Sequence, residues 1–157
     1  MTFKNEAQLK TFVLNKCKTA VIMAQERVYK IIERFMQEYY SDYSPELYER
    51  TYQLYRSLVK SEVISSANGF EAKVYFDLSS INYVTGASPS AEQVWQAAST
   101  GHHGAVGVSN GVALKFVAGN SGVILWNEQY QMQVQADAIE ILKNMLIAEG
   151  IPIVKGY

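Results

Sequence analysis

The N-terminal quarter of the chain contains the feature that most constrains its fold. Residues 5–40 include neither proline nor glycine, the two residues that most disfavour helices. Apolar residues recur there every three or four positions, which places them on one face of a helix. They are Leu9, Phe12, Val13, Cys17, Ala20, Val21, Ala24, Val28, Ile31, Ile32, Phe35, Met36 and Tyr39. The pattern predicts one long amphipathic helix over residues 1–40.

That helix is long for a chain of 157 residues. It would extend for roughly 54 Å, whereas a compact domain of this size has a diameter of about 40 Å. The helix must therefore break or extend beyond the domain. The polar segment Asn15–Thr19, which contains weak helix formers, is the best place for a break. An extension would leave an apolar stripe that needs a second subunit to cover it.

Residues 58–77 have the pattern of a β-hairpin. Apolar and polar side chains alternate on both sides of Asn68-Gly69, a dipeptide that favours a type I′ turn. In the second strand the alternation places four apolar residues on one face: Phe70, Ala72, Val74 and Phe76. A sheet with one apolar face is buried on that side only, so we expect a helical layer there.

Two short helices are predicted on either side of this hairpin. Ser44-Pro45 is typical of a helix start, and the first short helix is expected to continue through about Tyr55. Ser90 is expected to cap the second, in which Trp95 is the anchoring side chain.

The C-terminal half changes in composition. Six of the ten glycines lie in residues 101–122, where Asn110-Gly111 separates apolar runs. This segment is either three further strands or one long loop, and the apolar runs favour strands. Residues 127–150 have helical spacing and end at Gly150, a typical position for glycine after a helix.

Together these elements predict an α+β fold. The long N-terminal helix and the C-terminal helix are expected to pack on one face of a mainly antiparallel sheet. Since no repeat or linker divides the chain, we expect one domain over residues 1–157. It would comprise the helix 1–40, a mixed region 44–126 and the C-terminal helix 127–150.

Composition excludes several classes of protein. The chain has 14 Lys and Arg and 15 Asp and Glu, a net charge of −1, which is not that of a general nucleic-acid or anionic-membrane binder. The single Cys17 forms no internal disulfide, and the N-terminus lacks the apolar run of a signal peptide, so a reducing cytosol is expected. No apolar run approaches the length of about 20 residues that a membrane helix needs.

The sequence contains no convincing catalytic, cofactor or metal motif. His102 and His103 are adjacent, so on an extended chain they point to opposite faces, and no further ligand has a metal-site spacing. The segment Gly101–Gly107 resembles a phosphate loop in glycine content but fits neither common motif. Cys17 lies on the apolar face of the first helix, where an inert buried thiol is the usual case. We therefore expect that the protein is not an enzyme and that it has no cofactor-binding or metal site.

Six of the eleven tyrosines lie within seventeen residues: Tyr39, Tyr40, Tyr43, Tyr48, Tyr52 and Tyr55. Tyrosine combines a large apolar ring with a polar tip, which suits both interfaces and the edges of cores. Tyr48, Tyr52 and Tyr55 have helical spacing, so packing under the first helix explains some of them. Both interpretations stay open.

The run YSPELYERTYQLYRSL, followed by a strand, an Asn-Gly turn and a second strand, resembles a family of tailed-bacteriophage proteins. These are the head-tail joining or tail-completion (neck) proteins of long-tailed phages. In that family a long helix precedes a Pro, an Arg-Thr and a Leu-x-x-Ser-Leu. The matching residues here are Pro45, Arg50-Thr51, Leu54 and Ser57-Leu58. The family commonly has Gly after Arg-Thr, where this chain has Tyr52, and the family's Glu-Phe-Gly-Thr segment has no clear counterpart in residues 80–105.

The resemblance implies a structural virion protein that forms a sixfold or twelvefold ring at the head-tail junction or tail end. Its partners would be copies of itself, neighbouring neck, portal-associated or tail-tube proteins, and passing genomic DNA. It would reside in the virion, and in the host cytoplasm during assembly. The residues expected at interfaces are Tyr39, Tyr40, Tyr43, Tyr48, Arg50, Tyr52, Arg56, His102, His103 and Trp126.

Two alternatives remain. A small enzyme or nucleotide-binding domain would use His102, His103 and the adjacent glycines, and it requires a concave pocket with a carboxylate beside an imidazole. A DNA-contacting packaging accessory would require a basic cluster along one face.

Overall fold

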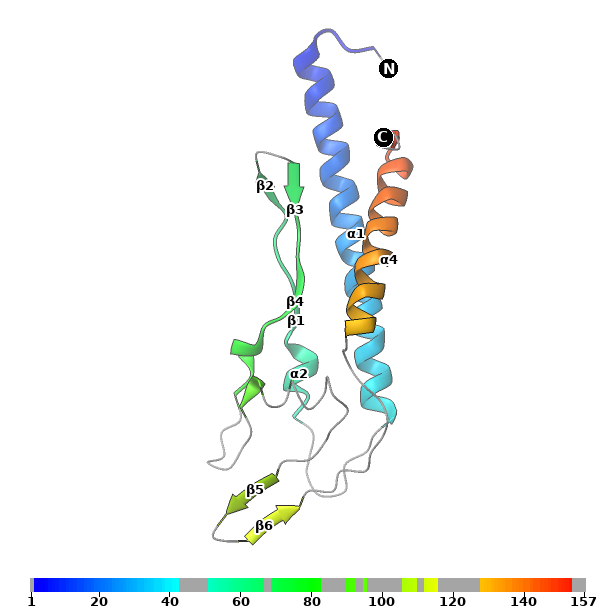
Figure 1. Ribbon diagram of the computed structural model, residues 1–157. Coiled ribbons are helices and arrows are strands. Elements are labelled where there is room, and N and C mark those ends of the chain that lie inside the picture. Colours follow the sequence, from blue (N-terminus) through cyan, green and yellow to red (C-terminus); the bar gives the residue numbers. More distant parts are fainter. Residues whose placement is uncertain are drawn as a thin grey trace. The chain divides into compact units, whose positions relative to one another are not determined.

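The computed structural model describes residues 2–42, 51–66, 69–82, 90–92, 95, 106–109, 112–115 and 128–153. The order of elements is α1 (Glu6–Asp42), α2 (Gln53–Arg56), β1 (Leu58–Lys60), β2 (Ile64–Ser66), β3 (Gly69–Glu71), β4 (Val74–Phe76), the short 3₁₀ helix η1 (Leu78–Ser80), β5 (Val106–Ser109), β6 (Val112–Lys115) and α4 (Glu128–Ala148) (Figure 1). Long helices at each end and short antiparallel strands between them confirm the predicted α+β class.

The chain divides into two compact units. The first comprises Met1–Ile31, Lys60–Val74 and Gln133–Tyr157, and the second comprises Ile32–Val59 and Tyr75–Met132. Both long helices and the hairpin contribute residues to each unit. That residues 1–157 form a single domain stays a prediction.

Helix α1 is continuous over 37 residues. Asn5 caps its start, because its side-chain Oδ1 accepts a hydrogen bond of 2.9 Å from the backbone N–H of Gln8. The break predicted at Asn15–Thr19 is wrong. Thr19 Oγ1 instead donates to the carbonyl of Asn15 at 3.1 Å, one turn earlier in the same helix. Low helix propensity costs only tenths of a kcal/mol per residue, which tertiary packing overrides.

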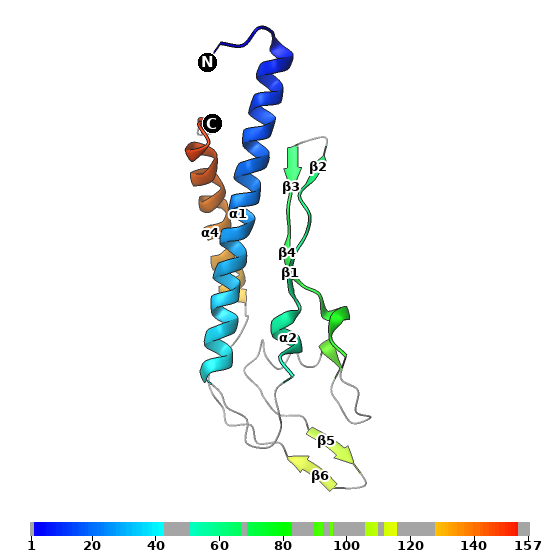
Figure 2. The same ribbon diagram turned by 180° about the vertical axis from the view of Figure 1, so that it is seen from behind.

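In the first unit, α4 runs antiparallel to α1, and the two helices lie side by side in both views (Figures 1 and 2). Lys16 Nζ and Glu149 Oε2 form an ion pair of 2.7 Å. Ala20 and Ala24 follow Lys16 at intervals of four residues, so all three lie on the face of α1 turned toward α4. Both alanines are buried. Small side chains on this face allow the two helices to approach closely.

The predicted C-terminal helix is confirmed and ends as expected. Gly150 has a φ of 81°, which glycine adopts without the strain that a Cβ causes. Beyond it, the N–H of Ile151 donates to the carbonyl of Leu146 at 2.9 Å. This is the 6→1 hydrogen bond of a Schellman motif.

The hairpin is confirmed, although both of its arms are interrupted. β2 pairs with β3 and β1 pairs with β4. The predicted position of the turn is wrong by one residue: Ser66 pairs with Gly69, so Gly69 belongs to β3 instead of the loop. Its φ of 133° is a conformation that glycine tolerates, which allows the strand to begin there. The predicted alternation holds, since Phe70 is half-buried and Glu71 is exposed.

A glutamine on α1 connects the helix to the interrupted part of the hairpin. Gln25 Nε2 donates to the carbonyl oxygens of Ser61 and Lys73, each at 2.9 Å. Those two residues also bond to each other, because the N–H of Ser61 donates to the Lys73 carbonyl at 2.9 Å and the Ser61 Oγ accepts from the Lys73 N–H at 2.8 Å. The Ser61 hydroxyl thus takes the place of a backbone carbonyl as the hydrogen-bond acceptor between the two strands. Gln25 holds both strands against α1.

In the second unit, the first short helix differs from the prediction. Residues 43–50 lie outside the described residues, but Thr51 and Tyr52 are not helical, and α2 begins only at Gln53. The prediction of one helix that runs from Ser44-Pro45 through to Tyr55 is therefore wrong. Tyr52 has a φ of 55°, which a right-handed helix does not contain.

Later segments agree with the predictions where they are described. Ala91, Glu92 and Trp95 are helical. β5 and β6 form an antiparallel pair in which Ser109 lies opposite Val112, so Asn110-Gly111 separates the strands as predicted. The third predicted strand, at residues 123–126, lies outside the described residues.

Candidate functional site

Four tyrosines form a contiguous aromatic cluster in the second unit. Tyr40 lies at its centre: its ring stacks on Tyr52 at 5.1 Å and 25°, and meets Tyr55 edge-on at 5.9 Å. Tyr39 packs edge-on against Tyr40 at 5.4 Å. The end of α1 supplies Tyr39 and Tyr40, whereas Tyr52 and Tyr55 come from α2 and the residue before it. Gln37 Nε2 also donates to the hydroxyl of Tyr55 at 3.3 Å. We call Tyr39, Tyr40, Tyr52 and Tyr55 the tyrosine cluster.

The cluster lies on a small hydrophobic core. Met36 is fully buried and packs with Tyr39, Leu54 and Ile81. Tyr40 and Tyr55 are partly buried against this core. The two interpretations of the tyrosines, as core and as interface residues, therefore apply to different residues. Tyr39 belongs to the core, whereas Tyr52 is 46% exposed and so is available for a contact.

Trp95 and a backbone amide complete the surroundings of this core. The Trp95 ring packs on Phe76 at 4.6 Å, which fits its predicted role as an anchor. The N–H of Asn82 donates to Gln53 Oε1 at 2.7 Å, so the segment after η1 is fixed to α2. The region under the tyrosine cluster is thus held by both apolar and polar contacts.

Tyr52 has an unusual backbone conformation. Among the described residues it is the one residue other than glycine with a positive φ, at 55°. A left-handed conformation costs a residue with a Cβ about 1–2 kcal/mol. Tyr52 therefore adopts a backbone conformation that is usual for glycine, while its ring stacks on Tyr40.

This strain makes a testable prediction. We expect Tyr52→Gly to be more stable than Tyr52→Ala by about 1 kcal/mol in chemical denaturation, because both variants lose the stacking on Tyr40 but only glycine relieves the backbone strain. Equal stability of the two variants would contradict a left-handed conformation at this position. At Gln53, one residue later and helical, the order should reverse, since alanine favours a helix more than glycine does.

The other residues expected at interfaces divide into two groups. Arg56 is exposed at the end of α2. The remaining six lie outside the described residues: Tyr43, Tyr48, Arg50, His102, His103 and Trp126. Tyr55 belongs to the tyrosine cluster and Gln37 donates a hydrogen bond to it, although neither was among the predicted site residues. For Tyr55 the available signal was its helical spacing from Tyr52.

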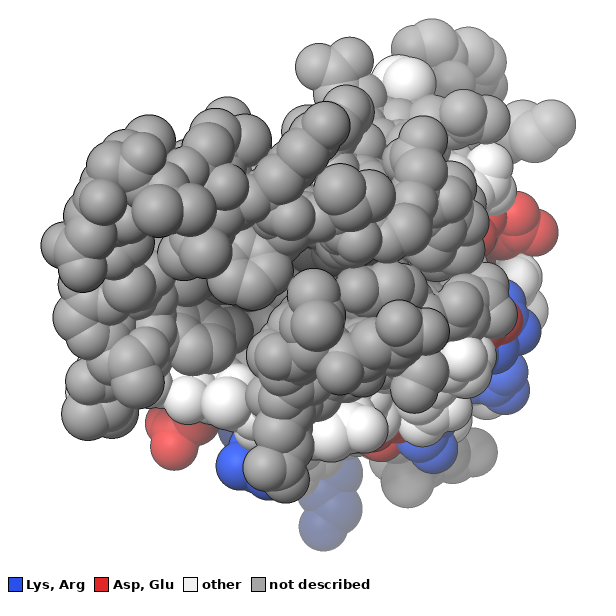
Figure 3. Space-filling view, turned by 90° about the horizontal axis from the view of Figure 1, so that it is seen from below, with Lys and Arg blue, Asp and Glu red and all other residues white. Residues whose placement is uncertain are grey.

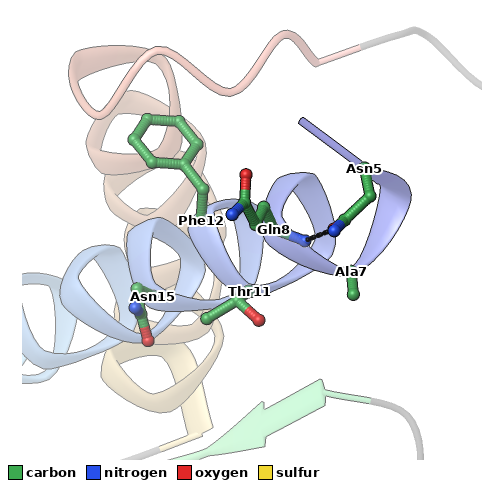
Figure 4. A pocket seen from close by; sticks show the side chains of 6 residues that line it. All are labelled: Asn5, Ala7, Gln8, Thr11, Phe12 and Asn15. Atoms are coloured by element: carbon green, nitrogen blue, oxygen red, sulfur yellow. Dashed lines mark hydrogen bonds between the residues drawn. The ribbon is translucent and has the colours of Figure 1, made fainter. Parts of the chain in front are cut away.

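Within the described residues, no group of three or more His, Cys, Asp or Glu is placed to hold a metal ion. Figure 4 shows an open depression at the start of α1, where Asn5 accepts the hydrogen bond from Gln8. Its lining is Asn5, Ala7, Gln8, Thr11, Phe12 and Asn15. It contains no ionisable side chain, so it offers no general acid, base or charged ligand group.

Charged residues of both signs lie near one another on the described part of the surface. Figure 3 shows one face, on which Lys and Arg lie beside Asp and Glu. In the first unit, Glu26 on α1 forms ion pairs with Lys60 of the hairpin and with Lys30 on its own helix. Lys60 also lies over the ring of Tyr29, with its Nζ 4.8 Å from the ring centre. None of the described helices combines the length and apolarity that a membrane span requires.

The ion pair of Glu26 predicts a pH dependence. The hydrogen bond from Lys60, with a smaller contribution from the charge of Lys30, lowers the pKa of Glu26 below its ordinary value of 4.5. A lowered folded-state pKa stabilises the fold at pH values above the unfolded pKa, and this contribution is lost as the pH falls through the folded pKa. We therefore expect wild type to exceed Glu26→Gln in stability at neutral pH and the difference to shrink below about pH 4.5.

Denaturation of both proteins across this pH range measures the effect. Glu33→Gln is the matched control, because Glu33 also lies on α1 and forms none of the ion pairs found among the described residues. A stability difference between wild type and Glu26→Gln that is constant over the whole range would contradict the pairing with Lys60.

The chain was compared with known proteins and families. No curated protein and no solved structure gave a match. A family model described as YomN matches residues 5–142, which include α1, the hairpin, β5, β6 and most of α4. This family is phage-derived. Because the match covers most of the sequence, the chain belongs to the YomN family.

Proposed function

We propose that this protein is a structural component of a tailed-phage particle and not an enzyme. It assembles as a ring at the head-tail junction or the tail end, as a neck, tail-completion or tail-terminator subunit. The phage origin of the family and the neck-like motif around Pro45 and Arg50-Thr51 support the proposal. A ring of six or twelve copies matches the symmetry of that location, and the genome would pass through it.

The observation that carries the proposal is the amount of apolar surface exposed. Among the described residues eleven large hydrophobic side chains are exposed, whereas nine hydrophobic residues are buried. A soluble protein that works alone usually keeps such side chains scattered and few, while extensive exposure marks contact surfaces. Copies of this chain and the neighbouring neck, portal-associated or tail-tube proteins would cover them.

The tyrosine cluster fits the same role. Tyr52 is exposed at its rim and is supported from below by the buried Met36 and Tyr39. Aromatic side chains on a rigid base are the usual anchors of protein interfaces. The alternative function, that of a small enzyme or nucleotide-binding domain, would depend on His102 and His103, which lie outside the described residues. Nothing in the described part of the chain favours it.

Electron microscopy of purified phage particles tests the proposal. We expect the protein in mature virions, where labelling should place it at the neck or tail end as a closed ring. The purified protein mixed with its virion partners should form rings of the same diameter. A protein that is absent from virions, or that stays monomeric with those partners present, would contradict the proposal.

A further inference from the structure

The two ends of the hairpin are paired in different registers. Towards its base, the N–H of Ser61 donates to the carbonyl of Lys73 at 2.9 Å. Further along, Ile64 pairs with Glu71. Two residues lie between Ser61 and Ile64, whereas one lies between Glu71 and Lys73. The first strand therefore has one extra residue here, which makes a β-bulge. We call this pairing the bulged register.

The bulge frees backbone groups, and two side chains bind them. Ser61 Oγ donates to the carbonyl of Glu62, one of the bulged residues, at 2.9 Å, and accepts from the N–H of Lys73 at 2.8 Å. In an uninterrupted antiparallel pair the Ser61 carbonyl would accept that N–H. Here the Ser61 carbonyl accepts from Gln25 Nε2 at 2.9 Å instead. Ser61 and Gln25 thus stabilise the bulged register.

The side chains of β2 do not favour this register. Ile64 is 54% exposed and lies opposite the exposed Glu71, whereas Ser65 lies opposite the half-buried Phe70. An apolar residue thus occupies the exposed face, and a polar residue lies opposite an aromatic ring. All three residues of β2 are exposed. A strand without a buried face specifies its register only weakly.

We propose that β2 and β3 switch between the bulged register and a regular register, in which the pairing at the base of the hairpin continues without a bulge. In the regular register Ile64 lies opposite Phe70, on the half-buried face, and Val63 lies opposite Glu71, on the exposed face. A shift by one residue moves each side chain of a strand to the other face. The regular register therefore forms an aliphatic–aromatic cross-strand pair that the bulged register lacks.

The two registers have opposing advantages. The regular register removes the bulge and pairs Ile64 with Phe70, but it moves Val63, which is half-buried in this structure, to the exposed face. It also lengthens the loop between the strands from two residues to three, and both lengths are common in hairpins. The bulged register keeps the hydrogen bonds of Ser61 and Gln25. Each difference concerns one side chain or one hydrogen bond, so the free energies of the two registers lie close together.

This inference goes beyond the proposed ring and does not depend on it. Gln25 and the hairpin from Lys60 to Val74 belong to the first unit, so the switch is contained within that unit. It changes which aliphatic residue points outward, Ile64 in the bulged register and Val63 in the regular one. A partner that contacts this part of the hairpin would bind one register better and shift the population toward it.

Nuclear magnetic resonance of the full chain distinguishes the two registers. A nuclear Overhauser contact between the Ile64 methyl groups and the Phe70 ring identifies the regular register. A contact between Ser65 and Phe70 identifies the bulged register. We expect wild type to show mainly the contact of Ser65, with relaxation dispersion at the amides of β2 that reports exchange with the regular register.

Two substitutions of neighbouring residues should shift the balance in opposite directions. Val63→Thr makes polar a side chain that the bulged register half-buries, so it should raise the ratio of regular to bulged register about fivefold. Ile64→Thr makes polar the side chain that the regular register would bury, so it should lower that ratio by a similar factor. Both variants keep a β-branched side chain, so strand propensity changes little.

Two further substitutions remove the hydrogen bonds that the bulge needs. Ser61→Ala and Gln25→Leu should each raise the ratio of regular to bulged register about fivefold. Gln37→Leu is the matched control for Gln25→Leu, because Gln37 also lies on α1 but its Nε2 donates to Tyr55. This control should leave the ratio unchanged.

Circular dichroism checks that each variant is folded. A wild-type protein without exchange in β2, together with a Ser61→Ala variant in which Ile64 never contacts Phe70, would overturn the proposal. It would also be overturned if Val63→Thr and Ile64→Thr shifted the ratio in the same direction. Loss of all contacts between β2 and β3 in Ser61→Ala would mean that the strands separate and do not change register, which the proposal excludes.

Discussion

Replacing Met36 with alanine is expected to lower the free energy of unfolding by about 2–5 kcal/mol. Met36 is fully buried in the second unit, where it packs with Tyr39, Leu54 and Ile81. Truncation removes apolar contacts from a core that contains few large side chains, and the resulting cavity adds to the loss. Urea denaturation measures the effect. The fluorescence of Trp95, which packs against the same core, reports on this unit.

The chain offers a matched control on the same helix. Met23 also lies on α1 but is 42% exposed. Met23→Ala should therefore change the stability by no more than about 0.5 kcal/mol. If the two variants lost the same amount, the burial of Met36 could not be the cause. The proposed core of the second unit would then be incorrect.

The long elements were predictable because their signals are local and repeated. The helical spacing of residues 5–40 and the closing Gly150 each identified a helix correctly. The continuity of α1 through Asn15–Thr19 was not predictable, because the low helix propensity there matters less than the ion pair of Lys16 with Glu149 and the burial of Ala20. That ion pair joins residues more than a hundred positions apart, so no local window contains it.

The short elements depend on single backbone angles, which a residue pattern identifies poorly. The dipeptide Asn68-Gly69 placed Gly69 in the predicted turn. In the structure its φ of 133° allows Gly69 to begin strand β3. Tyr52 had helical spacing with its neighbours, but its φ of 55° is not helical, and α2 begins only at Gln53.

The candidate site was predictable in its residue types but not in its geometry. The density of tyrosines indicated an aromatic region, either in the core or at an interface, and Tyr39, Tyr40 and Tyr52 do meet. Their exposures differ nevertheless, since Tyr39 is 9% exposed and Tyr52 is 46% exposed. Chain spacing alone cannot distinguish those roles.

The contact between α1 and α4 leads to the second large effect. Ala20 is fully buried on the face of α1 that carries Lys16, which pairs with Glu149. We expect Ala20→Leu to lower the stability by about 1–3 kcal/mol, because the added atoms have no space unless the two helices move apart. Leucine is itself a good helix former, so a loss would come from packing and not from helix propensity. Hydrogen exchange should show faster opening of α4.

Ala7→Leu is the control for this substitution. Ala7 lies in the first turn of the same helix and is exposed, so the larger side chain should change the stability by about 0.5 kcal/mol or less. The two variants have the same change in composition and in propensity, and they differ in what surrounds the new side chain. A stable Ala20→Leu protein with unchanged exchange in α4 would mean that the small residues of α1 do not set the distance between the helices.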